Sequence, residues 1–443
     1  TPNPKPQTPN PKPQTPNNHY HTTPMEIYLL RSFRPLYYTK KKTTVSKSLY
    51  NTMIKKVKLA KESEKLDLKE CHGCVNISGG ANIHSTDIID IANDYKIQRL
   101  SYPDFKLITS FPVNCTFQMV SNGKFVLVSN PHLSIYRSNG IPLIKSSCVD
   151  VEARFSDGSW CANCRHLYCS NLYIAVLTDK YTVTVLPTSQ FDSLEKSMVN
   201  EDLKLLKIES PLKKDTPNDD DTDDEAPHDQ TSPQAKEKFT DICLLEAELA
   251  ILHNNGRISL INLKDKIYRI ERDGEKKRNI ELNTHSTKQL PIIEGIAEEN
   301  IHKTIYTAVV MSSNFIMSAY HSKVDQMTVG FVLYSKKLLN PTKISTYDLS
   351  KQPIRNPQDG TNSSIDSIHH MKIVTAPRNG MEFVVAASVL RVIFLIAVRG
   401  SSEMSIIDSL YVSNWAHDSL TFYKNKDIII GTYGGIYKIE IQW

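Results

Sequence analysis

After residue 75 the sequence repeats one pattern, in which a short apolar segment, a turn and a second apolar segment follow one another. This pattern predicts β-hairpins, because alternating and β-branched runs favour strands and Pro, Asn and Gly favour the turns between them. The clearest hairpins are 124–136 (KFVLVSNPHLSIY), 172–186 (LYIAVLTDKYTVTVL), 249–263 (LAILHNNGRISLINL) and 427–441 (DIIIGTYGGIYKIEI). One format spread over about 300 residues indicates a repeated all-β architecture.

About 23 short strands can be assigned after residue 85, at intervals of about 8–12 residues. That number is too large for one sandwich. It suits a β-propeller of six or seven four-stranded blades, in which radial repetition leaves few exposed edges. The phrases SNGKFVLVSNPHLSIY and KNKDIIIGTYGGIYKIEI resemble the hairpins of divergent WD-repeat-like β-propellers, and the likeness spans residues 75–443. The Gly-His and Trp-Asp dipeptides of that family are absent. The resemblance implies a platform for protein–protein interaction.

Charge and cysteine content indicate the cellular compartment of the protein and the class of partner that its folded body can bind. The net charge is +5, but residues 26–61 hold ten Lys and Arg against one acidic residue, so the rest of the chain is slightly acidic. A folded body of that charge does not favour a nucleic-acid groove. Eight cysteines in 443 residues are too few for a disulfide scaffold and favour a reducing compartment, the cytoplasm or the nucleus. A mitochondrial presequence starting at Met25 is an alternative.

The first 74 residues are expected to differ from the rest. Residues 1–24 repeat the heptapeptide TPNPKPQ and hold eight of the 23 prolines, which predicts an extended, disordered tail. Residues 25–74 are basic, and 40–70 show helical spacing of small or apolar residues: Ser48, Leu49, Met53, Val57 and Ala60. The short basic helix would pack against the folded body, or alternatively contact a membrane surface or a nucleic acid.

Two polar segments interrupt the predicted propeller of residues 75–443. Residues 211–238 include six Asp and one Glu between Asp215 and Glu225. Such a segment buries too little apolar surface to offset the entropy of ordering it, so it is predicted to be a disordered acidic insertion. Residues 341–367 are rich in Pro, Asn, Asp and Ser and are predicted to be a second loop.

One cluster has the residue types of a zinc site, with four ligands that would be Cys161, Cys164, His166 and Cys169. The cluster leads into the predicted strand at 172–177, where alternation sends neighbouring side chains to opposite faces. Buried free cysteines are therefore the favoured interpretation, and zinc is the alternative. The glycine-containing loop 78–82 lacks the spacing of a phosphate-binding motif. No catalytic residue, cofactor or metal is assigned.

Residues 383–398 (FVVAASVLRVIFLIAV) form the segment that comes nearest to a membrane span. The segment is shorter than the roughly 20 residues that a helix needs, and Arg391 lies near its middle. β-Branched residues on both sides of Leu390-Arg391 favour two buried strands. A span would resemble the anchor of the endoplasmic-reticulum exchange factors for small coat GTPases, which are tethered propellers with a loop loosely similar to 78–82.

Two functional hypotheses follow. The favoured one is a non-enzymatic interaction scaffold, a monomer within a larger complex that binds other proteins through loops on the propeller rim. The alternative is a membrane-tethered propeller that acts as an exchange factor or regulator of a small GTPase in vesicle traffic.

The ring of blades is expected to close by strand pairing between its two ends. Residues 427–441 are predicted to pair with a strand near 75–100, because Ile88, Ile89 and Ile91 match the apolar run at 428–430.

Overall fold

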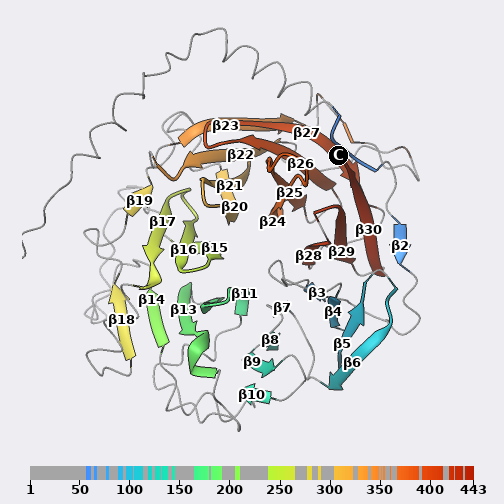
Figure 1. Ribbon diagram of the computed structural model, residues 1–443. Helices are drawn as coiled ribbons and strands as arrows, with labels where there is room; N and C mark the ends of the chain where they lie inside the picture. The colour runs from blue at the N-terminus through green and yellow to red at the C-terminus, as the bar shows by residue number, and fades with distance from the viewer. Residues whose placement is uncertain are drawn as a thin grey trace, which may run out of the picture. The chain divides into compact units, whose positions relative to one another are not determined.

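The computed structural model is dominated by short strands (Figure 1). It describes residues 56–60, 64–66, 76–78, 88–92, 96–102, 104–112, 118–121, 125–130, 132–137, 142–144, 164–178, 181–191, 205–209, 238–264, 277–281, 288–290, 304–322, 328–337, 341–348, 351, 353–354, 360, 367–388, 392–412, 419–423, 425–432 and 435–443. These residues belong to one compact unit, Ile54–Trp443. The predicted tail (1–24) and nearly all of the acidic insertion lie outside the described residues, so both stay predictions.

The described residues form seven sheets, numbered here in chain order. Sheet 1 contains β3 (Asn76–Ser78), β4 (Ile88–Ala92), β5 (Lys96–Ser101) and β6 (Leu107–Pro112). Sheet 2 contains β7 (Gln118–Ser121), β8 (Phe125–Asn130), β9 (His132–Arg137) and β10 (Pro142–Ile144). Sheet 3 contains β11 (Cys164–Cys169), β12 (Tyr173–Thr178), β13 (Thr182–Pro187) and β14 (Leu205–Glu209), with the 3-10 turn η2 (Thr188–Phe191) after β13. A fifth strand, β18 (Lys277–Glu281), pairs with β14 in parallel.

The remaining sheets repeat the format. Sheet 4 contains β15 (Phe239–Leu245), β16 (Glu248–His253), β17 (Ile258–Asn262) and β19 (Lys288–Leu290). Sheet 5 contains β20 (Thr304–Met311), β21 (Phe315–Ser322), β22 (Thr328–Ser335) and β23 (Pro341–Asp348). Sheet 6 contains β24 (Ile368–Thr375), β25 (Glu382–Ser388), β26 (Val392–Arg399) and β27 (Glu403–Tyr411). Sheet 7 contains β28 (Ser419–Tyr423), β29 (Asp427–Thr432) and β30 (Gly435–Gln442), joined by β1 (Lys58–Leu59) and β2 (Glu64–Leu66).

The first strands of the seven sheets contact one another in a closed cycle. β3 contacts β7, β7 contacts β11, and the series continues through β15, β20, β24 and β28 back to β3. The sheets therefore stand around a common axis with their first strands innermost, as Figure 1 shows. Their facing sides are packed: Phe331 of β22 and Phe394 of β26, for example, belong to one core cluster between sheets 5 and 6. The prediction of an all-β propeller is confirmed.

All four predicted hairpins are confirmed as the pairs β8–β9, β12–β13, β16–β17 and β29–β30. The backbone conformation and the close packing at the Asn-Asn-Gly turn both require its glycine. Gly256 has a φ of +86°, and a Cβ atom at this position would lie 2.5 Å from the Tyr306 ring of sheet 5. Only glycine combines that backbone conformation with so close an approach.

The ring closes in sheet 7, but not through the predicted partner. β30 pairs with β29 on one side and with β1 and β2 on the other. Residues 76–101 form strands of sheet 1 instead, and Ile89 and Ile91 pack against Ile429 and Ile436 of sheet 7. The prediction of pairing with 75–100 is therefore wrong. The isoleucines of the two segments pack face to face between sheets 1 and 7. The edge of β30 that is available for pairing lies on the outer side of sheet 7, where β1 and β2 occupy it.

The described part of the segment predicted to be helical is strand. Burial alternates from Val57 through Lys58 to Leu59, which is the two-residue period of a strand. Leu59 N donates a hydrogen bond to Asp408 Oδ2 at 2.8 Å, and Ala60 N donates to Glu440 O at 2.9 Å. The helix prediction is wrong for these residues, because their burial depends on β30, which lies at the other end of the chain. The propeller unit thus begins before residue 75.

Residues 383–398 fold as the hairpin β25–β26. Phe383–Ala387 and Val392–Val398 are all buried, and the break predicted at Leu390-Arg391 falls between the two strands. The membrane-span alternative is wrong for this segment. Among the described residues, no helix is long and apolar enough to cross a membrane.

The loop predicted for 341–367 begins with a strand. β23 is the outermost strand of sheet 5, and its described residues are exposed or half-buried. The loop prediction is wrong for Pro341–Asp348, because an outer strand needs few apolar residues and its polar sequence also fits a loop. Most of 349–366 lies outside the described residues.

Candidate functional site

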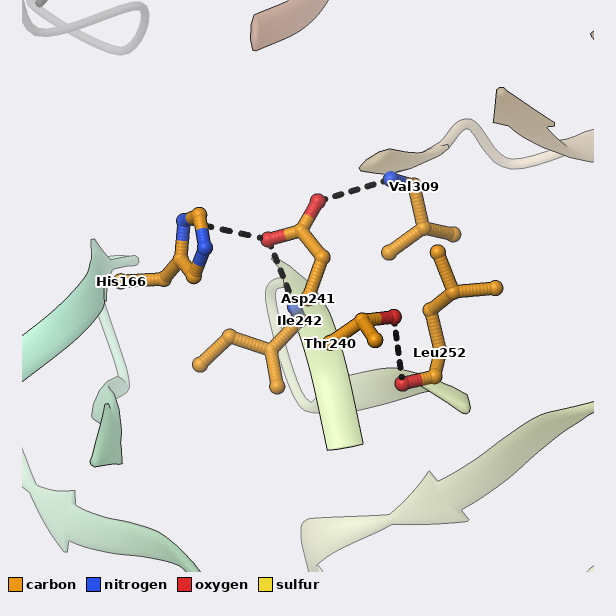
Figure 2. A network of polar contacts seen from close by, with 6 residues as sticks. All are labelled: His166, Thr240, Asp241, Ile242, Leu252 and Val309. Atoms are coloured by element: carbon orange, nitrogen blue, oxygen red, sulfur yellow. Dashed lines mark hydrogen bonds and ion pairs between the residues drawn. The ribbon is translucent and has the colours of Figure 1, made fainter. Parts of the chain in front are cut away.

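A buried carboxylate joins three neighbouring sheets near the axis. Asp241 lies on β15, and its side chain is 2% exposed. Its Oδ1 accepts a hydrogen bond from Ile242 N at 2.8 Å, and its Oδ2 accepts one from Val309 N on β20 at 2.7 Å. His166 Nδ1 on β11 lies 3.4 Å from Oδ1. Figure 2 shows the carboxylate between His166 and Val309; these groups are called the Asp241 cluster here.

Bulges near the start of the first strands orient this cluster. In β11, β15, β20 and β24 the pairing with the second strand skips one residue, which is Arg165, Thr240, Thr307 or His369. A bulge changes the direction of the side chains beside it. In β15 the residue after the bulge is Asp241. The first strand of a sheet pairs along one edge only, so some of its N–H groups have no partner in the sheet. Asp241 accepts a hydrogen bond from such a group, Val309 N on the first strand of the neighbouring sheet.

Two protonated groups lie beside Asp241. Burial raises the pKa of Cys243, two residues further along β15, to about 12, and the charge of Asp241 adds to this effect. Burial also raises the pKa of Tyr168 on β11, with smaller contributions from Asp241 and Cys243. The thiol and the phenol are therefore neutral hydrogen-bond donors at neutral pH, and this thiol is a poor nucleophile.

We expect Cys169 and Cys243 to alkylate slowly in the folded protein. Burial raises the pKa of both thiols to about 12, so the reactive thiolate is scarce at pH 8. Against an ordinary cysteine, the thiolate fraction falls by roughly three orders of magnitude. Iodoacetamide labelling followed by peptide mass spectrometry, with and without urea, measures the ratio at each residue. Equal rates in the folded and unfolded protein would contradict the expectation.

A partly exposed lysine lies on the first strand of sheet 6. Lys372 lies on β24 and is only partly exposed. Burial lowers its pKa from 10.5 to about 8, and Cys243 is the group that acts against this shift. No hydrogen bond or ion pair joins Lys372 to another described residue. Burial therefore disfavours the charged form of this amine.

Replacing this lysine should stabilise the protein. Lys372→Met removes a cation whose burial is unfavourable, and a pKa shift of this size, reduced for partial exposure, corresponds to about 1–3 kcal/mol at pH 7. Below pH 8 the lysine is charged in both states, so the full difference is present. Between pH 8 and 10.5 only the unfolded state keeps the proton, so the wild type gains stability and the difference shrinks. Thermal unfolding of the wild type and of Lys372→Met from pH 7 to 10 measures this difference in stability.

The structure separates two of the four residues of the suggested zinc site, His166 and Cys169. His166 approaches Asp241, whereas Cys169, three positions along the same strand, lies on the opposite face and donates to Ser170 O at 3.4 Å. The side chain of Cys164 and all of Cys161 lie outside the described residues. Among the described residues, no three His, Cys, Asp or Glu side chains gather as metal ligands.

Sequence patterns alone did not reveal the Asp241 cluster. Its available signal was a single acidic residue inside an otherwise apolar strand, FTDICLL. A buried charge in such a place needs a partner, but the partner Val309 is 68 residues away. Of the glycine-containing loop at 78–82, only Ser78 is described, as the last residue of β3.

A second set of contacts joins the sheets at one end of their strands. Ser170 Oγ of sheet 3 donates to Glu246 O of sheet 4 at 2.9 Å, and Lys336 of sheet 5 forms an ion pair with Glu248 of sheet 4. Tyr102 OH of sheet 1 donates to Asp427 Oδ2 of sheet 7 at 2.7 Å. These contacts involve turns between first and second strands or after third strands, which share one rim. They link neighbouring sheets at that rim.

No protein-family model and no curated protein matches the chain by sequence. Solved structures match it by fold. The WD40 β-propeller domain of Doa1 is 11% identical, with 86% of this chain and 96% of that chain covered and a TM-score of 0.47. The computationally designed protein Ika8 is also 11% identical, with 86% and 100% covered and a TM-score of 0.47.

A further match is a chain of the S. cerevisiae complex of Dbp5 bound to Nup159, Gle1, IP6 and ADP. It is 9% identical, with 88% of this chain and 96% of that chain covered and a TM-score of 0.50. Likeness at such low identity concerns the fold alone. The cyclic contacts and the sheet topology define the fold as a β-propeller.

Proposed function

We propose that this chain is a non-enzymatic scaffold that binds other proteins through the rim of its propeller. The observation that carries the proposal is that charged side chains, buried or partly buried, link strands and sheets of the propeller. Asp241 joins three sheets, and Asp427 accepts a bond from a neighbouring sheet. Arg99 donates to both oxygens of Asp90 at 2.7 and 2.8 Å within sheet 1. These groups fix a body from which loops project, and a fixed body with variable loops suits recognition of a partner.

The rim with the inter-sheet contacts is the proposed binding face. Leu172, in the turn between the first and second strands of sheet 3, is 42% exposed. Leu107 and Ile108, which follow the turn after the third strand of sheet 1, are 53% and 54% exposed. Both turns lie at the same end of their sheets, because neighbouring strands alternate in direction. Exposed apolar side chains at one rim fit a protein partner better than a solvated surface.

A matched pair of variants tests this face. Leu172→Asp places a charge on the proposed rim, whereas Ile344→Asp places one on the outer strand β23, where Ile344 is 37% exposed. Pull-down from a cell extract with the full chain, analysed by mass spectrometry, should retain a protein with the wild type and Ile344→Asp that Leu172→Asp loses. Equal retention by both variants would reject the rim as the binding face.

We further propose that the chain is a monomer within a larger complex, in the cytoplasm or the nucleus. The free thiols of Cys169 and Cys243 support a reducing compartment. Light scattering of the purified chain tests the monomer, and a doubled mass would contradict it. Regulation of a small GTPase becomes the better account if the retained protein is a GTPase and the purified chain accelerates its nucleotide release.

A further inference from the structure

The outer edge of sheet 3 carries a strand that comes from sheet 4. β14 pairs with β13 on its inner side and with β18 on its outer side, and Figure 1 shows β18 beside β14. β18 belongs to the connection between β17 and β19, which are neighbouring strands of sheet 4. The chain therefore leaves sheet 4 after β17, adds a strand to sheet 3 and returns. β1 and β2 extend sheet 7 in the same way, so outer edges of this propeller accept added strands.

The sequence of β18 matches the edge of β14 poorly. The register places Arg278 opposite Leu206 and Ile280 opposite Ile208. Leu206 and Ile208 are fully buried in the core cluster between sheets 3 and 4. Paired residues of neighbouring strands share a face of the sheet, so a charged residue takes the position opposite Leu206 where an apolar one would extend the core. The pair is also parallel, and parallel pairing is slightly less stable per residue than antiparallel pairing.

We propose that the outer edge of β14 is a docking site for an extended segment of another protein, and that β18 occupies this edge until such a segment replaces it. The docking site is separate from the binding rim, because it is a strand edge rather than a set of turns. Backbone hydrogen bonds between strands do not depend on the side chains, so any extended segment without proline can form them. A segment with apolar residues opposite both Leu206 and Ile208 would bury more apolar surface than β18 does.

The covalent connection of β18 decides which partners can replace it. The chain joins β18 to β17 on one side and to β19 on the other, so its effective concentration at β14 is roughly millimolar, as for other short tethers. A partner replaces β18 when the ratio of its concentration to its Kd exceeds the same ratio for the tethered strand. β18 thus keeps the edge covered against weakly binding strands, which an open edge would attract.

The test compares the binding of one peptide to a covered and to an open edge. The probe is a fluorescein-labelled peptide of residues 275–283 with the substitution Arg278→Ile, EKKINIELN. The open-edge variant is the full-length chain with residues 277–281 replaced by GSGSG, and circular dichroism shows whether it folds. Fluorescence anisotropy measures the Kd of the probe for both proteins. The control peptide adds Asn279→Pro and Ile280→Pro, because neighbouring N–H groups alternate in direction and one of the two must face β14.

The open-edge variant should bind the probe about tenfold or more tightly than the wild type, and neither protein should bind the proline peptide. Equal affinity for the two proteins, or no binding by a folded open-edge variant, would overturn the proposal. Hydrogen exchange of the wild type gives a second measurement that does not depend on the variant. Excess probe should accelerate amide exchange in residues 277–281 and leave β23 unchanged. If exchange in β18 stays the same at saturating probe, the peptide does not replace β18 and the proposal is wrong.

Discussion

Removal of the first 67 residues should open the propeller and cause aggregation. The truncated chain lacks β1 and β2, which pair with the outer edge of β30, and it loses the buried side chains of Val57, Leu59 and Leu66. Burial of three such side chains contributes roughly 5–9 kcal/mol, which is comparable with the whole stability of a folded domain. The exposed edge of β30 would then be available to pair with other chains. Thermal unfolding and light scattering measure both effects.

The control is a chain that lacks residues 1–53 only. It keeps both closing strands, because the compact unit begins at Ile54. We expect its melting midpoint to match that of the full chain. If the two truncated chains behave alike, pairing of β30 with β1 and β2 does not hold the ring closed.

Asp241→Ala should be the most destabilising single substitution in the Asp241 cluster. It removes a buried acceptor and leaves the N–H groups of Ile242 and Val309 unpaired. Each buried donor without a partner is unfavourable by about 1–3 kcal/mol, so the loss for the two donors should be about 2–6 kcal/mol. Urea unfolding monitored by fluorescence measures it.

Two further variants identify the cause. Asp348→Ala removes a partly exposed carboxylate that pairs with the exposed Lys351, and it should change stability by about 1 kcal/mol or less. Asp241→Asn keeps one acceptor oxygen, so it should lie between the wild type and Asp241→Ala. If Asp241→Ala is no worse than Asp348→Ala, the carboxylate does not join the sheets.

The sequence predicted the middle of each sheet better than its edges. Hairpins such as β16–β17 and β29–β30 lie between neighbouring strands, so they are apolar and show a clear pattern. The fourth strands β14 and β23 were not predicted, because a strand far from the axis needs apolar residues on one face at most. β1 and β2 are two and three residues long, and their pairing with β30 has no local signal.

The candidate site could not be predicted for a related reason. The residue types of β11 suggested a metal site, because sequence spacing does not show which face of a strand a side chain occupies. The actual contacts of His166 and Asp241 depend on bulges and on the order of the sheets around the axis.

The closing strands impose an order of events on biosynthesis. Leu59 and its acceptor Asp408 are 349 residues apart, so Leu59 leaves the ribosome long before its partner exists. At about 5–20 residues per second, translation of the intervening chain takes roughly 20–70 s. During that time the earlier sheets can stack, but the ring stays incomplete until β30 emerges. The nascent chain therefore exposes sheet faces and strand edges until its own N-terminal strands pair with β30.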